Sequence, residues 1–128
     1  MTDLWDPETT PNFARYELAC KCGTCGWRAD MLQSTMDSLQ ALREALGRPL
    51  TITSGFRCPN HPIEKRKRSP GSHAVGRAVD IAAPAGSEKF EIVAEGIRLG
   101  LVGIGVSDGF IHIDTGHPSA PRPAAWTY

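Results

Sequence analysis

The spacing of apolar residues predicts two helices. Between Asp30 and Gly47 apolar residues recur every three or four positions, as on one face of a helix, with Asp30 expected to cap its start and Gly47 to end it. A second helix is expected from about Ser87 to near Gly100. The residues expected to face the core are Leu32, Met36, Leu39, Leu42 and Leu46 in the first helix and Phe90, Val93, Ile97 and Leu101 in the second.

Three other segments alternate apolar and polar residues, as strands do. They are residues 49–55, residues 76–83 and residues 102–114, and the last contains a Ser-Asp-Gly turn typical of a hairpin. The polar stretch 58–71 is expected to be an exposed loop, and the proline-rich tail after 115 to be irregular. This order of elements predicts an α+β fold.

Composition limits the class of protein. The chain has 128 residues, 41% hydrophobic and 22% charged, with a formal net charge of zero, which fits one globular domain over 1–128 with residues 1–12 and the tail after 115 at its periphery. No segment approaches the ~20 apolar residues of a membrane span, and the first ten residues do not resemble a signal peptide. We therefore expect synthesis in the cytoplasm, with neither membrane nor nucleic acid as a partner.

One carboxylate stands where a buried strand is predicted. A buried acid needs a partner or a metal ion, so Asp80 raises the question of what neutralises it. The period of two in the last strand puts His112 and Asp114 on one face, and an adjacent Asp80 strand would bring His73, Asp80 and His112 together. Two imidazoles and one carboxylate are typical of a catalytic zinc site. The plainer alternative is that these residues are ordinary hydrogen-bonded groups.

Three motifs in order carry a family resemblance. The stretches "TSGFRCPNH", "SHAVGRAVDI" and "GFIHIDTG" resemble the zinc-dependent D-alanyl-D-alanine carboxypeptidases and phage endolysin peptidases, over Phe13 to Thr115. The resemblance implies the fold group of lysostaphin and hedgehog, with an antiparallel sheet that carries the zinc site and packs against helices. It also implies that His73, Asp80 and His112 bind zinc, and that Arg57 contacts a substrate carbonyl or carboxylate.

The chain departs from that family at two positions. Gly109 stands where many relatives have an acid three residues before the last zinc ligand, so the general base is expected to be Asp114 or Asp108. Asp114 is preferred because it shares a face with His112, and its alternative role is to orient that histidine. Gly71 replaces the motif serine, and Ser72 is a candidate for substrate binding or for capping a turn.

The cysteines form a separate group. Cys20, Cys22 and Cys25 lie close together in the sequence and Cys58 follows Arg57, so the four residues suit either two disulfides or a structural zinc site. In either form they are expected to tie the N-terminal segment to the loop that carries Arg57.

The expected function is hydrolysis of a peptide bond in bacterial peptidoglycan by a monomeric zinc peptidase. The D,D-carboxypeptidase, endopeptidase and L-alanyl-D-glutamate peptidase types remain open, in a phage endolysin, a virion-associated lysin or a wall-remodelling enzyme that acts on the cell wall. The main alternative is a catalytically silent module of the same fold that binds peptidoglycan or a protein. A nucleic-acid binder built on the cysteines and the basic run Lys65 to Arg68 is a third class, and the zero net charge argues against it. That run is otherwise expected to be solvated.

Overall fold

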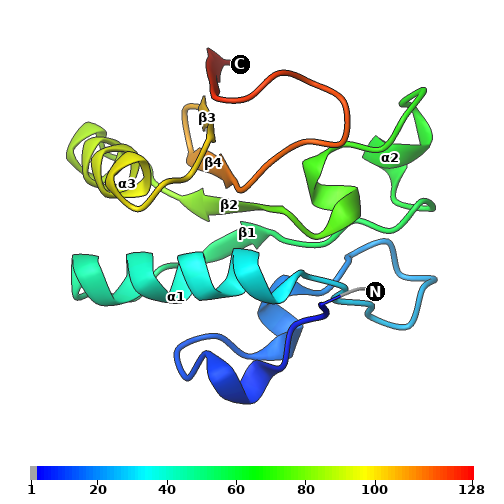
Figure 1. The fold of residues 1–128 in the computed structure, drawn as a ribbon. Coiled ribbons are helices and arrows are strands. Elements are labelled where there is room, and N and C mark those ends of the chain that lie inside the picture. The colour runs from blue at the N-terminus through cyan, green and yellow to red at the C-terminus, as the bar shows by residue number, and fades with distance from the viewer. Residues whose placement is uncertain (1–2) are drawn as a thin grey trace.

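One five-stranded mixed sheet organises the protein, which the computed structural model describes over residues 3–128. The strands follow the spatial order β1-β2-β4-β3-β5, and all neighbours are antiparallel except β3 and β5. Figure 1 shows α1 beside β1, with the N-terminal segment against α1 and the C-terminus at the opposite side of the molecule. The strands are β1 Ile52–Ser54, β2 Ala78–Ala82, β3 Gly103–Val106, β4 Phe110–Asp114 and β5 Ala124–Thr127; the helices are α1 Gln33–Leu46, α2 Pro62–Lys65 and α3 Gly86–Arg98, with 3₁₀ turns η1 Pro7–Thr9, η2 Arg15–Leu18 and η3 Ser72–Val75.

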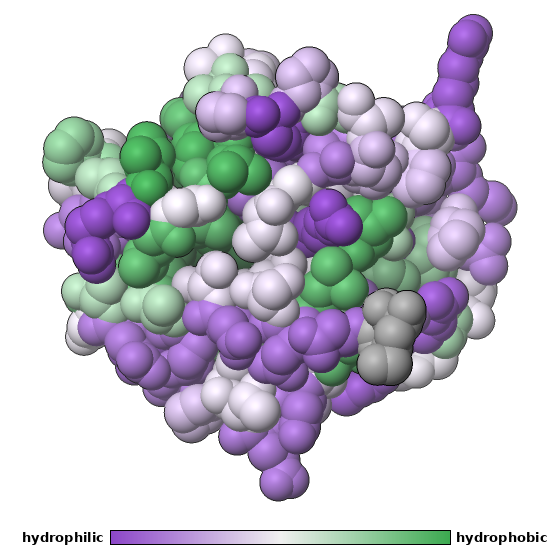
Figure 2. Space-filling model, viewed as in Figure 1, coloured by the Kyte–Doolittle hydropathy of each residue, from purple (hydrophilic) through white to green (hydrophobic). Residues whose placement is uncertain are grey.

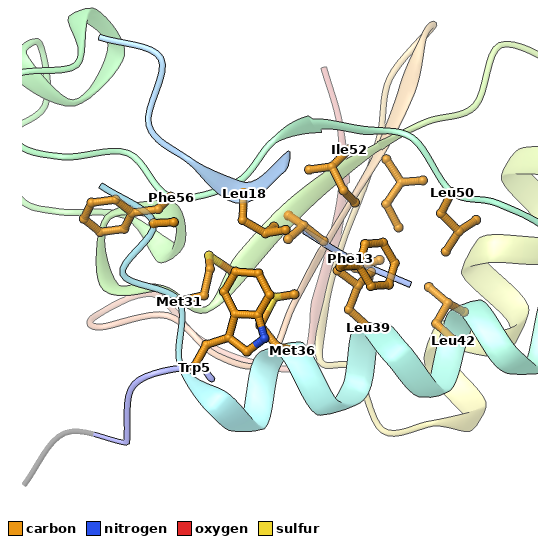
Figure 3. Close-up of a cluster of buried hydrophobic side chains, with 14 of the residues drawn as sticks. Trp5, Phe13, Leu18, Met31, Met36, Leu39, Leu42, Leu50, Ile52 and Phe56 are labelled. Carbon is orange, nitrogen blue, oxygen red and sulfur yellow. The ribbon is translucent and has the colours of Figure 1, made fainter. Parts of the chain in front are cut away.

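The core lies between the sheet and the two long helices. Alternation in β2 and β4 sends Val79, Ile81, Ile111 and Ile113 to this side, all of them buried. The N-terminal segment, expected at the periphery, contributes the buried Trp5, whose indole Nε1–H donates to Thr10 Oγ1 at 2.9 Å. The close-up in Figure 3 shows the side chains that gather between α1 and the N-terminal half of the chain, namely Trp5, Phe13, Leu18, Met31, Met36, Leu39, Leu42, Leu50, Ile52 and Phe56.

The first helix forms where the apolar spacing places it, but its start differs. It begins at Gln33 after Leu32, and Leu32 provides no side-chain cap. The expectation that Asp30 caps the helix was wrong, because that carboxylate instead accepts two hydrogen bonds from Arg28. Gly47 ends the helix in the left-handed conformation, with φ 67°, as expected. Figure 2 shows hydrophilic residues along the exposed side of α1, consistent with an amphipathic helix.

The buried face of α3 was predicted wrongly in part. Phe90 and Ile97 are 73% and 61% exposed, whereas Ile92 and Gly96 are buried. Ile92 and Gly96 lie one turn apart on the same face of α3, and this face packs against the sheet. A Cβ at Gly96 would lie within 4 Å of Ile104 and Ile113, whereas Phe90 and Ile97 lie on the exposed side of the helix.

Two segments expected to be irregular contain regular structure. The tail, expected to be irregular, forms β5, which pairs in parallel with β3. The sheet is therefore mixed, although the strands β1, β2, β4 and β3 pair antiparallel as expected. The loop 58–71 contains the short helix α2, and Glu64 on it is buried while the basic residues 65–68 are exposed. Within residues 3–128 no helix has the length and apolar character needed to cross a bilayer.

The corrected face of α3 predicts unequal effects of two matched substitutions. Ile92→Ala removes a fully buried side chain and is expected to lower the free energy of unfolding by about 2–5 kcal/mol. Ile97→Ala, on the same helix but exposed, is expected to change it by less than about 0.5 kcal/mol. Urea unfolding followed by circular dichroism measures both values, and equal losses would contradict this packing.

Candidate metal centre

Two neighbouring strands and one short turn bring the predicted metal ligands together. Asp80 on β2 lies directly opposite His112 on β4 in the antiparallel register. Both side chains point to the face of the sheet opposite the isoleucine core, because side chains alternate along a strand. His73 reaches the same face from η3, and all three residues are buried. The sequence prediction that these three residues converge is therefore confirmed by the structure.

The carboxylate of Asp80 lies between the two imidazoles. Its Oδ1 is 3.2 Å from Nε2 of His73 and 3.1 Å from Nδ1 of His112. One ligand atom from each residue lies within 4.8 Å of the others, which is close enough for all three to bind one ion. The two rings meet edge to face, with centroids 5.1 Å apart.

The outer nitrogen of each imidazole faces a hydrogen-bond acceptor. Nδ1 of His73 lies 2.8 Å from the carbonyl oxygen of Gly55, and Nε2 of His112 lies 2.7 Å from Oδ2 of Asp114. Nδ1 of His73 must donate, because a carbonyl oxygen only accepts, and this leaves a lone pair on its inner nitrogen. Both nitrogens of His112 face carboxylates, and the tautomer that donates to Asp114 leaves its inner Nδ1 free. In these tautomers two lone pairs and a carboxylate oxygen converge, an arrangement that a cation would complete. The donor set fits zinc, with the outer contacts fixing the ring orientation as they do around metal-bound histidines.

The pKa values of the buried residues indicate an excess of negative charge at this site. Burial alone would lower the pKa of His112, but its hydrogen bonds to Asp114 and Asp80 outweigh burial and raise the pKa above its usual value. Burial also opposes ionisation of Asp80, yet hydrogen bonds from His112 and His73 bring its pKa well below the ordinary range. For His73, burial dominates and lowers the pKa. The site thus favours ionised carboxylates with a positive charge between them.

Asp114 lies behind His112, on the side away from Asp80. Its side chain is completely buried, and Arg122 donates to both carboxylate oxygens, from Nε at 3.0 Å and from Nη2 at 2.8 Å. The backbone N–H of Gly116 donates to Oδ1 at 3.1 Å. Burial raises the pKa of Asp114, but the bonds from His112 and Arg122 prevail and lower it. Both oxygens are therefore engaged with protein donors.

Glycines in β3 make room for this arrangement. Gly103 lies opposite Asp114 and Gly105 opposite His112 in the pairing of β3 with β4. A Cβ at Gly103 would overlap the carboxylate of Asp114, and one at Gly105 would lie 2.6 Å from Nε1 of Trp126. Trp126 from β5 leans across this gap, and its ring centroid is 5.0 Å from that of His112. The strand thus leaves the space that its neighbours' side chains fill.

The predicted substrate arginine lies beside the metal ligands. The Nε–H of Arg57 donates to Oγ of Ser54 at 3.1 Å, and Nη2 lies 3.4 Å from Oδ2 of Asp80. Nη1 is 3.7 Å from the buried Glu64, which also accepts from Nζ of Lys67 at 3.0 Å. Burial would raise the pKa of Glu64, but Lys67 outweighs it and the pKa is lowered. Glu64 therefore holds the basic loop and Arg57 together.

An open groove of about 760 Å³ runs over this face of the sheet. It contains the predicted metal ligands and Arg57. It extends from Thr53 and Ile63 on one side to Phe110, Trp126 and Tyr128 on the other. Among the groove residues that sequence reasoning did not place here are His117, Arg122, Trp126 and Tyr128. Trp126 and Arg122 were missed because β5 was not predicted. The available signal was the pair of alternate glycines in β3, Gly103 and Gly105, which leave space for larger side chains from a neighbouring strand.

His117, in the tail, is half-buried in the groove. Its Nδ1 accepts the backbone N–H groups of Ser119 and Ala120 at 3.0 and 2.8 Å. The ring proton of the neutral form is therefore on Nε2, where it is available as a donor.

Two other residues that the sequence singled out, Ser72 and Asp108, do not join the predicted metal ligands. Ser72 lines the groove, but its hydroxyl is buried and donates to the carbonyl oxygen of Gly116 at 2.8 Å, which ties η3 to the tail. Asp108 lies exposed in the hairpin turn and borders a different pocket, together with Lys89 and Thr127. The carboxylate of Asp108 is thus outside the groove.

The four cysteines also come together. Sγ atoms of Cys20, Cys22, Cys25 and Cys58 all lie within 4.8 Å of one another, and none is in a disulfide. This cluster is separate from the histidine site and borders the loop that carries Arg57.

Comparison with known proteins gives one family. The family model described as Peptidase M15 matches residues 11–114, which include His73, Asp80, His112 and Asp114. No curated protein matches the chain.

The close approach of Asp114 to Gly103 predicts that a side chain at position 103 destabilises the protein. Gly103→Ala places a methyl group against the buried Asp114 carboxylate and is expected to cost about 1–3 kcal/mol of unfolding free energy. Gly109→Ala is the control, because a Cβ there meets nothing within 4 Å. Thermal unfolding of both variants measures the difference, and an unchanged Gly103→Ala protein would contradict the described contact.

Proposed function

This chain belongs to the peptidase M15 family, and we propose from that premise that it hydrolyses a peptide bond in the stem peptides or cross-links of bacterial peptidoglycan. Membership of the family implies a zinc peptidase of the cell-wall type. The observation that carries the proposal is the convergence of two imidazole lone pairs and the Asp80 carboxylate at the floor of an open groove.

The chain supplies three ligands and the groups that orient them. Zinc would be held by Nε2 of His73, the carboxylate of Asp80 and Nδ1 of His112. Zinc bound by three protein ligands polarises a carbonyl and lowers the pKa of its water to about 7. The carbonyl oxygen of Gly55 and the carboxylate of Asp114 keep the two rings aimed at the ion.

Arg57 is proposed to bind the substrate. Ser54 fixes its Nε–H, while the planar guanidinium has further N–H donors at the edge of the groove. A substrate carbonyl or carboxylate can accept two of these donors in parallel, beside the metal ligands. Nε2–H of His117 is a further donor on the groove wall.

We assign Asp114 a positioning role. A general base must present a free oxygen to the attacking water, whereas both oxygens of Asp114 accept from protein donors and its side chain is fully buried. Its contact with Nε2 of His112 instead selects the tautomer whose Nδ1 is free to bind metal. Of the two roles open from the sequence, orientation of His112 agrees better with these contacts.

The shape of the groove favours an internal peptide bond. It crosses β1, β2, β4 and β5, with the metal ligands near its middle. Thr53 and Ile63 are available to residues on one side of the scissile bond, and Phe110, Trp126 and Tyr128 to those on the other. This arrangement suits an endopeptidase better than an enzyme that removes a terminal residue.

A catalytically silent zinc module is the second candidate. Among the groove residues, all within the described range 3–128, Asp80 is the only carboxylate, and position 109 holds glycine. Such a module would bind zinc and stem peptides without cleaving them.

The proposed activity is tested by substitution of a ligand. Asp80→Asn is expected to lose zinc from the histidine site and to release no fragment from muropeptides, because a neutral amide cannot balance the metal charge. Asp37→Asn, on the exposed side of α1, is the matched control and is expected to behave as wild type. Mass spectrometry of the digest identifies the bond; wild-type protein that carries zinc at this site without cleavage would support the silent module.

The role of Asp114 gives a separate prediction. Asp114→Asn is expected to weaken zinc binding about 10–100-fold, with activity largely restored when zinc is in excess. A catalytic base would show the opposite, unchanged zinc affinity with a kcat that excess zinc does not restore. Competition with a chromophoric chelator measures the affinity, and kcat at saturating zinc separates the two roles.

A further inference from the structure

We propose that Cys20, Cys22, Cys25 and Cys58 bind a second, structural zinc ion as four thiolates. Three of the sulfurs come from one irregular loop before α1, and the fourth from the residue that follows Arg57. All four Sγ atoms lie within 4.8 Å of one another, and those of Cys22 and Cys58 are 3.4 Å apart. The site is independent of the histidine site and of the proposed peptidase activity.

The spacing of the sulfurs suits a metal better than disulfides. A disulfide brings two sulfurs to about 2.05 Å and separates them from other pairs. A tetrahedral ion with bonds of about 2.3 Å holds its sulfurs about 3.8 Å apart, each equally near the other three. The Sγ atoms of Cys22 and Cys58, 3.4 Å apart, are near that separation, and every other pair lies within 4.8 Å.

Backbone donors point at two of the sulfurs. The N–H of Thr24 donates to Sγ of Cys22 at 3.4 Å, and the N–H of Cys58 donates to Sγ of Cys20 at 3.3 Å. Such bonds stabilise negative charge on sulfur, as a metal-bound thiolate requires. Thr24 Oγ1 also lies 3.4 Å from Sγ of Cys22.

Four ligands leave no position for substrate, so the role is structural. Cys20 and Cys58 are buried, and Cys22 and Cys25 are partly buried against the core. The loop that carries Cys20, Cys22 and Cys25 has positive φ at Gly23 and, just after Cys25, at Gly26 and Trp27, and the side chain of Trp27 is 65% exposed. A loop with this backbone and so little apolar burial gains its order from a cross-link.

The first test counts metal ions in protein purified under reducing conditions after growth with zinc. Elemental analysis is expected to give two zinc ions per chain for the wild type, one for His73→Ala/His112→Ala, and one for Cys22→Ser/Cys25→Ser. These two cysteines are chosen because they are the less buried pair. Full zinc content in the cysteine variant, or none in the histidine variant, would overturn the proposal.

A second measurement does not depend on the cysteine variant folding. Cobalt added to the metal-free His73→Ala/His112→Ala protein is expected to give a thiolate-to-metal charge-transfer band and the visible bands of a tetrahedral site. Absence of that band would overturn the proposal, as would a non-reduced mass about 4 Da below the reduced mass, since two disulfides remove four hydrogens. If the wild-type protein fails to cleave muropeptides while the His73→Ala/His112→Ala protein gives this cobalt spectrum, the peptidase activity alone is refuted.

Discussion

The structure depends on one electrostatic constraint, the meeting of three electron-pair donors on a buried face of the sheet. When the inner nitrogens of both imidazoles carry lone pairs, the carboxylate oxygen 3.1–3.2 Å from them is repelled unless a cation lies among the three groups. The register of β2 with β4 nevertheless places Asp80 opposite His112, and the outer contacts prevent the rings from turning away. Each contact therefore increases the affinity of the site for a cation, at a cost in stability when the cation is absent.

Support for this cluster extends outward through the tail. Asp114 orients His112, Arg122 holds Asp114, and the Arg122 guanidinium lies 5.0 Å from the Trp126 ring centre. Trp126 in turn packs over Gly105 and against the His112 ring. The tail from Arg122 through β5 is thus part of the site, because Arg122 holds Asp114 and Trp126 packs against the His112 ring, and both residues line the groove.

Local patterns were sufficient to predict the centre of the site, but not its surroundings. Strict alternation in "FIHID" placed His112 and Asp114 on one face and Ile111 and Ile113 on the other, since the side-chain period of a strand is fixed by its backbone. The buried face of α3 depends on how Gly96 lies against Ile113, in a strand far along the chain. The pairing of β5 with β3 is likewise a contact between separate segments, which no local spacing encodes. The burial of Glu64 depends on the fold of the loop that brings it beside Arg57.

The short segment 55–58 joins the two metal-ligating clusters. The carbonyl oxygen of Gly55 orients His73, the N–H of Phe56 donates to the carbonyl oxygen of Leu18 at 2.9 Å, and the N–H of Arg57 donates to the carbonyl oxygen of His73 at 3.3 Å. Cys58 ends the segment within the cysteine cluster. An ion bound by the cysteines would hold one end of this segment, so the position of the Gly55 carbonyl, and with it the aim of His73, would follow from a metal site that takes no part in chemistry. The architecture therefore accounts for four cysteines placed next to Arg57: an ion bound by them would supply the rigidity that a three-residue strand and an irregular loop lack.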